Sequence, residues 1–196
     1  FASDDHKVKL FPANRALVSS GKVGGFNADF RELIKGGCDD NTTGFVQNWQ
    51  DNSKGKSAEK YFYRGIIGSL KENKTIESLY DSANEWWMWN NWSSVDPEQS
   101  INYAFAHDNY CAFDKVSLPR PNGTQWDAGY RTAQIKFAHA MVFTAQGLAF
   151  LHAGDEMLRT KKLAGETLPY EPVRNTYMWG TERNTLDWSL RSTNAT

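Results

Sequence analysis

The chain has 196 residues and a formal net charge of −1 at pH 7, with 40% hydrophobic and 23% charged residues. This composition is typical of a folded globular protein and excludes a disordered segment. The near-neutral charge and the lack of a basic stripe argue against a nucleic-acid-binding surface. The longest apolar region, residues 135–151, is interrupted by charged and polar side chains and is too broken to span a bilayer.

The first helix is predicted over residues 26–34, where apolar residues recur at helical spacing before Gly36 and Gly37. A second helix is expected over residues 57–70, although two glycines within it weaken the pattern. Polar residues 71–100 contain four tryptophans between positions 86 and 92. We predict a surface loop there, whose rings either pack on the main body or line a groove.

Alternating residues predict a strand over positions 101–106, which ends at the polar triplet His107-Asp108-Asn109. A helix is predicted over residues 128–146, with Asp127 as its N-cap. The apolar run 148–152 then predicts a short buried parallel strand. Strand, helix and strand form a βαβ unit, so both strands end at one edge of the sheet. We therefore expect His107 and Asp108 to approach the polar segment 152–156.

These polar residues also have ordinary explanations. A His-Asp pair occurs by chance at many strand ends, and a histidine within a helix, such as His139, is usually a core or rim residue. Asp155 and Glu156 fit the first turn of a helix, where the helix dipole favours acids, slightly better than a direct ligand contact. The two cysteines, Cys38 and Cys111, are too few for a disulfide scaffold, and their spacing does not decide whether they pair.

Two features of the sequence bear on the cellular compartment of the protein: its Asn-X-Ser/Thr triplets and the residue at which the sequence begins. Asn-X-Ser/Thr triplets begin at five positions and favour a secreted or extracellular protein, although an Asn-, Ser- and Thr-rich chain acquires some by chance. The triplets start at Asn41, Asn73, Asn91, Asn122 and Asn194. The sequence begins at Phe1 without a signal-like segment, so we expect a processed chain or a piece of a longer one.

Four ordered blocks between residues 24 and 190 resemble a known family. Residues 102–114, with His107-Asp108-Asn109 and Asp114, resemble the end of the seventh strand of the (β/α)8 barrel in the α-amylase superfamily. Residues 146–161 are similar to the eighth strand in its pullulanase and limit-dextrinase branch. Residues 175–188 resemble the loop that follows in these debranching enzymes, and residues 26–36 resemble their sixth repeat.

The resemblance implies an α/β fold in which residues 1–196 form the C-terminal part of a catalytic (β/α)8 TIM barrel, about its last three βα units. Such a piece is expected to need the rest of the barrel, because a barrel buries its inward side chains only when closed. The nucleophile Asp and acid/base Glu of the family match no segment here.

The implied activity is hydrolysis of α-1,6-glucosidic linkages in pullulan, starch or glycogen-derived dextrins by a retaining mechanism. Asp108 matches the transition-state-stabilising carboxylate. The implied substrate-binding residues are His107, Asn109, Tyr110, Asn175, Tyr177 and Asn184. The implied partners are an α-glucan and the remaining barrel, with neither nucleic acid nor membrane. No cofactor is assigned; calcium sites are common in the superfamily, but the sequence has no EF-hand or zinc-type ligand spacing.

Two other functions stay open at this point. Thr181 and Thr185 stand where the family commonly has an acidic and a basic residue. These changes suit a non-catalytic α-glucan-binding or structural protein derived from the same barrel. An isoamylase or an α-1,4 hydrolase of the superfamily would differ only in linkage specificity.

Overall fold

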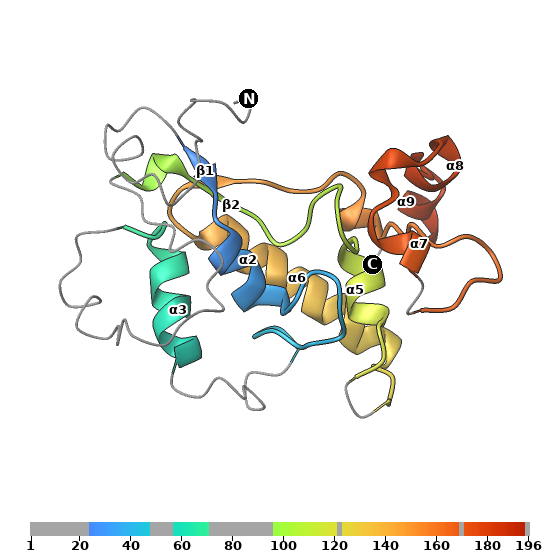
Figure 1. The fold of residues 1–196 in the computed structure, drawn as a ribbon, viewed down its shortest axis with the longest axis horizontal. Coiled ribbons are helices and arrows are strands. Elements are labelled where there is room, and N and C mark those ends of the chain that lie inside the picture. Colours follow the sequence, from blue (N-terminus) through green and yellow to red (C-terminus); the bar gives the residue numbers. More distant parts are fainter. Residues whose placement is uncertain (1–23, 48–56, 71–95, 121–122, 169–170, 195–196) are drawn as a thin grey trace, which may run out of the picture. The chain divides into compact units, whose positions relative to one another are not determined.

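The computed structural model describes residues 24–47, 57–70, 96–120, 123–168 and 171–194 (Figure 1). The chain divides into two compact units. The sheet unit comprises residues up to 33, 54–103 and 142–150, and the loop unit comprises residues 34–53, 104–141 and 151–196. The predicted tryptophan loop up to residue 95, and the triplets at Asn73, Asn91 and Asn122, lie outside the described residues.

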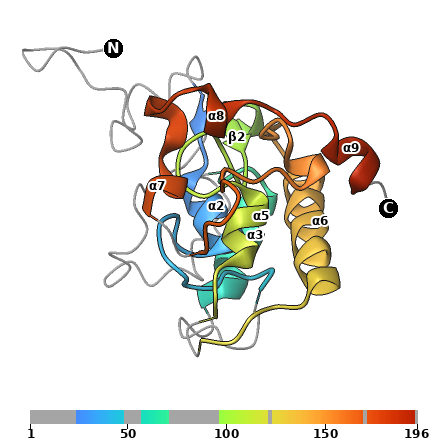
Figure 2. The ribbon, with the colours of Figure 1, turned by 90° about the vertical axis from the view of Figure 1, so that its right-hand side faces the viewer.

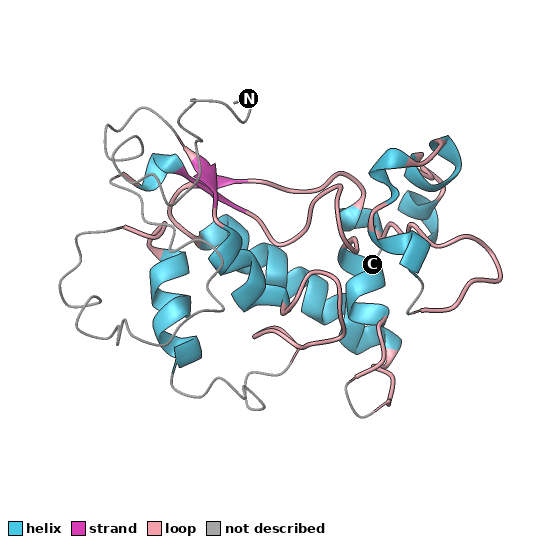
Figure 3. Ribbon diagram, viewed as in Figure 1, coloured by secondary structure: helices cyan, strands magenta, loops and turns pink. Residues whose placement is uncertain are grey.

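The sheet unit contains three parallel strands in the order β1-β2-β3, shown in magenta in Figure 3. They are β1 (Gly25–Phe26), β2 (Ser100–Asn102) and β3 (Leu148–Ala149). Phe26 pairs with Ile101, which in turn pairs with Leu148. The predicted strand over residues 101–106 is therefore too long, because the chain turns from β1 into a helix at Ala28 and offers nothing further to pair with.

Parallel pairing of β3 is confirmed, but its predicted burial is wrong. Leu148 is 54% exposed and Leu151 is 38% exposed. The physical reason is its place at the edge of the described sheet, where only β2 pairs with it. An edge strand with apolar side chains in solvent is an unusual arrangement for a completed α/β sheet.

Buried amides connect the strands of the sheet unit. The side-chain nitrogen of Asn27 lies 3.0 Å from Ser69 Oγ and 3.1 Å from Asn102 Oδ1. The other end of Asn27 caps helix α2 (Ala28–Lys35), since its Oδ1 accepts a hydrogen bond from Phe30 N at 3.2 Å. This cap explains why the first helix begins two residues later than its apolar pattern predicts.

Helix α3 (Ser57–Ile66) is four residues shorter than predicted. Gly68 has φ +72 and Ser69 has φ +57, both left-handed, and Ser69 N donates to Arg64 O at 2.8 Å. A left-handed glycine ends a helix in this way because it has no Cβ to clash. The short helix η1 (Pro97–Gln99) precedes β2.

The loop unit contains mostly short helices. Helix α5 (Ala112–Ser117) lies beside helix α6 (Ala128–Thr144), as Figure 2 shows, and the Arg131 guanidinium of α6 lies 5.4 Å from the Phe113 ring. Asp127 caps α6 as predicted, accepting from Tyr130 N at 2.8 Å. The remaining helices are η2 (Asp155–Met157), α7 (Glu171–Arg174), η3 (Thr176–Met178), α8 (Thr181–Asn184) and α9 (Leu190–Thr193).

Within the described ranges, none of the helices combines the length and the apolar character that a membrane span requires.

Candidate functional site

The candidate site lies in the loop unit, where the chain emerges from the core. Residues 103–106 are all buried, whereas His107 is exposed and Asp108 and Asn109 are half-buried. Asn109 has φ +57, a left-handed conformation that asparagine tolerates better than most residues. This turn brings the His107 and Asp108 side chains out of the core.

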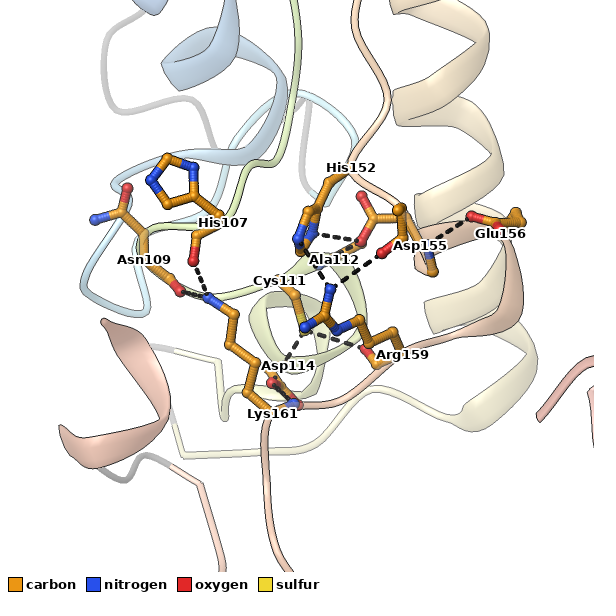
Figure 4. A network of polar contacts seen from close by, with 12 residues as sticks. His107, Asn109, Cys111, Ala112, Asp114, His152, Asp155, Glu156, Arg159 and Lys161 are labelled. Carbon is orange, nitrogen blue, oxygen red and sulfur yellow. Dashed lines mark hydrogen bonds and ion pairs between the residues drawn. The ribbon is translucent and has the colours of Figure 1, made fainter. Parts of the chain in front are cut away.

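The backbone of this turn is held by side chains from distant segments (Figure 4). The Lys161 ammonium donates to His107 O at 2.6 Å, to Asn109 O at 2.8 Å and to Arg174 O at 3.3 Å. The amide N–H of Asn109 donates to Asn175 Oδ1 at 2.8 Å. Peptide groups on both sides of Asp108 are thus fixed by hydrogen bonds.

The Asp108 carboxylate itself accepts no hydrogen bond from the described part of the chain. Its negative charge does favour the protonated form of Lys161, whose pKa is nevertheless lowered, mainly because its ammonium is buried. Asp108 is therefore a half-buried acceptor on a fixed backbone, available to a ligand. This combination is what electrostatic stabilisation of a developing positive charge requires.

Aromatic side chains lie next to the His107 imidazole. The Tyr177 ring makes an edge contact with it, with centroids 5.5 Å apart and planes at 76°. Tyr177 and Trp179 are each 51% exposed. Exposed rings beside a carboxylate form a surface on which the C–H face of a sugar could stack, in keeping with the amphipathic use of such rings.

The side-chain amide of Asn184 forms hydrogen bonds within this aromatic segment. Its side-chain nitrogen donates to Thr176 O at 2.7 Å and to Trp179 O at 3.1 Å, and its Oδ1 accepts from Thr176 Oγ1 at 2.7 Å. The amide of Asn184 is thus committed to holding Tyr177 and Trp179 in place. A direct substrate contact, which the resemblance implied, would have to compete with these bonds.

Tyr110 also lies elsewhere than its implied role requires. Its side chain is 2% exposed and packs with Leu118 and Val173 in a hydrophobic cluster. A buried ring cannot reach a ligand at the surface, so Tyr110 supports the turn from below. The structure brings together His107, Asp108, Asn109, Asn175 and Tyr177 by direct contact or adjacency, and removes Tyr110 from the accessible surface.

The chain was compared with known protein families, sequences and structures. No protein-family model matches the chain. The pullulanase of Bacillus subtilis strain 168 is 31% identical over 194 residues, which is 96% of this chain and 21% of that protein. The crystal structure of apo pullulanase from Paenibacillus barengoltzii matches 94% of this chain and 23% of its own with a TM-score of 0.66 and 29% identity. The chain is related to the pullulanases.

A second crystal structure of the Paenibacillus barengoltzii pullulanase contains maltohexaose and α-cyclodextrin. It matches 93% of this chain and 24% of its own, with a TM-score of 0.64 and 29% identity. The chain thus spans between a fifth and a quarter of the length of these pullulanases. The resemblance of the four sequence blocks to this branch is confirmed by relatives that cover nearly the whole chain.

The second polar segment of this pullulanase-related chain contacts the start of α5; among the described residues no contact joins His107 or Asp108 to residues 152–156, so their predicted approach stays a prediction. Ala112 N donates to Asp155 Oδ1 at 3.4 Å, which joins the start of α5 to the start of η2. Asp155 is 1% exposed and lies 3.4 Å from His152 Nδ1 and 3.5 Å from His139 Nε2. Burial raises the pKa of Asp155, but the two imidazoles outweigh it, so the pKa is lowered.

These contacts decide the role of the second segment. His152 Nε2 lies 3.2 Å from Arg159 Nη1, a group that can only donate, so this histidine carries its proton on Nδ1, facing Asp155. Asp155 lies in the first turn of η2, as its ordinary explanation predicted. His139 is a half-buried helix residue beside it, again as predicted.

A further buried acid, Asp114, lies beneath the site. It accepts from Thr160 Oγ1 at 2.5 Å, from Lys161 N at 2.8 Å and from Cys111 Sγ at 3.1 Å. Burial raises the pKa of Asp114 although these hydrogen bonds oppose it. No disulfide joins Cys38 to Cys111, so the open question of their pairing is answered in the negative.

Lys161 is the residue that sequence reasoning missed. It lies at the end of the block 146–161, and beside Thr160 and Lys162 it has the pattern of an exposed polar run. No periodicity marks it, because residues 158–162 are irregular and only the fold buries its side chain.

No group of three or more histidine, cysteine or acidic residues in the described ranges could hold a metal ion.

Proposed function

We propose that this chain is part of a pullulanase-type glycoside hydrolase that cleaves α-1,6-glucosidic linkages in pullulan, starch or glycogen-derived α-glucans. The observation that carries the proposal is the presentation of Asp108: a half-buried carboxylate on a fixed turn, accepting no hydrogen bond from the described residues, in a chain related to pullulanases along 96% of its length. Asp108 is the proposed transition-state-stabilising group.

In a retaining mechanism, one carboxylate attacks the anomeric carbon while an acid protonates the departing oxygen, and water then hydrolyses the covalent glycosyl-enzyme. The ring carbon becomes positively charged on the way. A carboxylate held in place by its backbone stabilises that charge without reorganising, which is the source of its catalytic effect. His107 is proposed to donate a hydrogen bond to sugar hydroxyls, with Tyr177 stacking nearby.

The nucleophile and the acid are proposed to come from the rest of a longer polypeptide, called the full-length enzyme below. The chain spans 21% of the Bacillus subtilis pullulanase, and β3 exposes Leu148 at the edge of its sheet. Residues 1–196 would then contribute about three βα units to a closed barrel, which would cover that edge.

The proposal is tested by the products of the full-length enzyme. We expect it to release reducing sugar from pullulan and much less from linear amylose, and the first product seen by NMR to have the α-configuration. Cleavage of amylose alone would replace the linkage assignment with an α-1,4 hydrolase. Binding of glucan without any release of reducing sugar would favour the non-catalytic alternative.

A bidentate ion pair near the aromatic segment gives a pH-dependent prediction. Arg183 donates to Glu166 Oε1 at 2.6 Å and to Oε2 at 2.8 Å, and lowers the pKa of Glu166 to about 2. A carboxylate with a lowered pKa in the folded state adds stability above its unfolded pKa of about 4.5, and this stability is lost as pH falls towards about 2.

The melting temperature of Glu166→Gln in the full-length enzyme should therefore lie below that of the wild type at neutral pH, with the difference shrinking as pH falls below about 4.5. Glu98→Gln is the control, since Glu98 is exposed and forms no ion pair with a described residue. If the difference in melting temperature between the wild type and Glu166→Gln stays constant down to the lowest pH at which the enzyme is folded, the ion pair does not titrate in this way.

A further inference from the structure

Resting on the proposed function, we propose that Lys161 is a positioning residue for Asp108: its buried ammonium is a built-in cation that fixes the peptide groups on either side of the catalytic carboxylate. The side chain is 1% exposed. Its ammonium donates to the carbonyls of His107, Asn109 and Arg174, and carbonyl oxygens arranged around a positive charge are also found at bound metal ions.

The hydrogen bonds define which torsions are held. The bond to His107 O fixes the peptide plane that enters Asp108. The bond from Asn109 N to Asn175 Oδ1 fixes the plane that leaves it. The bond from Lys161 to Asn109 O fixes the next plane, beyond the left-handed residue. With three successive peptide planes held, the Cα–Cβ direction of Asp108 is determined before any substrate arrives.

The energetics show why this lysine is costly to bury and costly to lose. Burial lowers the pKa of its ammonium, which means that the interior of the protein destabilises the charged form of Lys161. The carboxylate of Asp114, which is 1% exposed, partly offsets this lowering of the pKa because its negative charge favours the protonated ammonium. Asp114 also accepts a hydrogen bond from the backbone N–H of Lys161 at 2.8 Å. Removing the ammonium would leave three carbonyls without this donor and would take away a positive charge that favours the ionised form of buried Asp114, a change that usually destabilises.

Lys115 is a matched comparison within the same unit. It is also 1% exposed, and its ammonium donates to three carbonyls, those of Gly37 at 2.7 Å, Asp40 at 2.7 Å and Thr42 at 2.9 Å. The chemistry is that of Lys161, but the carbonyls belong to residues 37–42 and not to the turn that carries Asp108. Its removal therefore measures what a buried lysine contributes to folding when it bonds none of the peptide groups beside Asp108, although Asp39 within its loop does accept a hydrogen bond from the Asn109 side chain at 2.9 Å.

The test compares Lys161→Met and Lys115→Met in the full-length enzyme. Both should lower the melting temperature by similar amounts. Only Lys161→Met should lower kcat on pullulan strongly, by about 100-fold, with KM changed by less than about 3-fold, because a displacement of about 1 Å in a catalytic group has that effect. Equal losses of kcat in both variants would overturn the proposal.

A double variant separates positioning from general damage. If Lys161 acts only through Asp108, then Lys161→Met should reduce kcat by less than about 3-fold once Asp108→Asn is present, while it still lowers the melting temperature. A loss of about 100-fold in both backgrounds would refute positioning and leave the proposed function intact. Near-normal turnover of Asp108→Asn alone would instead refute the proposed function.

If Lys161→Met fails to fold, Asn175→Ala replaces it. Asn175 is exposed, and the substitution removes only the acceptor for Asn109 N–H from this set of bonds. Asn175→Ala should likewise lower kcat when Asp108 is present and have little effect on kcat when Asp108→Asn is present. If the losses of kcat caused by Asn175→Ala and Asp108→Asn are fully additive, that would count against the positioning of Asp108 by these hydrogen bonds.

Discussion

Asp108→Asn in the full-length enzyme is expected to lower kcat on pullulan by about 10²–10⁴-fold, which corresponds to about 3–5 kcal/mol of lost transition-state stabilisation. Asparagine keeps the size and shape of the side chain but removes the charge that opposes the developing positive charge on the sugar. Because the backbone of the turn is held by Lys161 and Asn175, the fold should be unchanged. Initial rates and the melting temperature are the measurements.

Asp127→Asn is the matched control for this substitution. Asp127 is exposed and caps α6 through a hydrogen bond from Tyr130 N, a role that asparagine fills equally well. Its kcat and melting temperature should equal those of the wild type. Turnover of Asp108→Asn within a few-fold of that of Asp127→Asn would show that Asp108 is not the stabilising carboxylate.

The second large effect concerns the chain by itself. Residues 1–196 expressed alone should show no cooperative thermal transition and no monomeric mass. The described sheet has three strands of two or three residues, and its edge strand exposes Leu148. Apolar side chains at an open edge promote association with other chains, and the proposed barrel covers them only when it is closed.

Circular dichroism melting and light scattering after size-exclusion chromatography make this measurement. The full-length enzyme is the control and should melt cooperatively. A sharp melt together with a mass of one chain would establish that these residues form an independent domain, and the proposed need for the remaining barrel would then be withdrawn.

Helix positions were the most predictable feature of the fold. The apolar spacing and the Asp127 cap located α6 to within two residues of its end, because capping and amphipathic packing are local properties. The strands were less predictable. An alternating pattern extends from residue 101 to 106, but the length of a strand depends on its partners, and β1 has only two residues to pair with.

Within the site, the sequence by itself determined which residue types end the strand and in what order. The βαβ pattern also predicted that His107 and Asp108 approach residues 152–156, because parallel strands in such a unit end at one edge, and the contact that the structure describes there is made by Ala112. Only the tertiary structure decided the roles. It buried Tyr110, committed Asn184 to the backbone of residues 176–180, and placed the ammonium of Lys161 beneath Asp108.

The physical reason is that these roles depend on contacts between residues far apart in the chain. A lysine in an irregular segment is solvated unless carbonyl groups from other segments surround it, and Lys161 meets carbonyls 54 and 52 residues away. Periodicity and capping describe neighbours along the chain. Burial of a charge, and the use made of it, are determined by the fold that assembles around it.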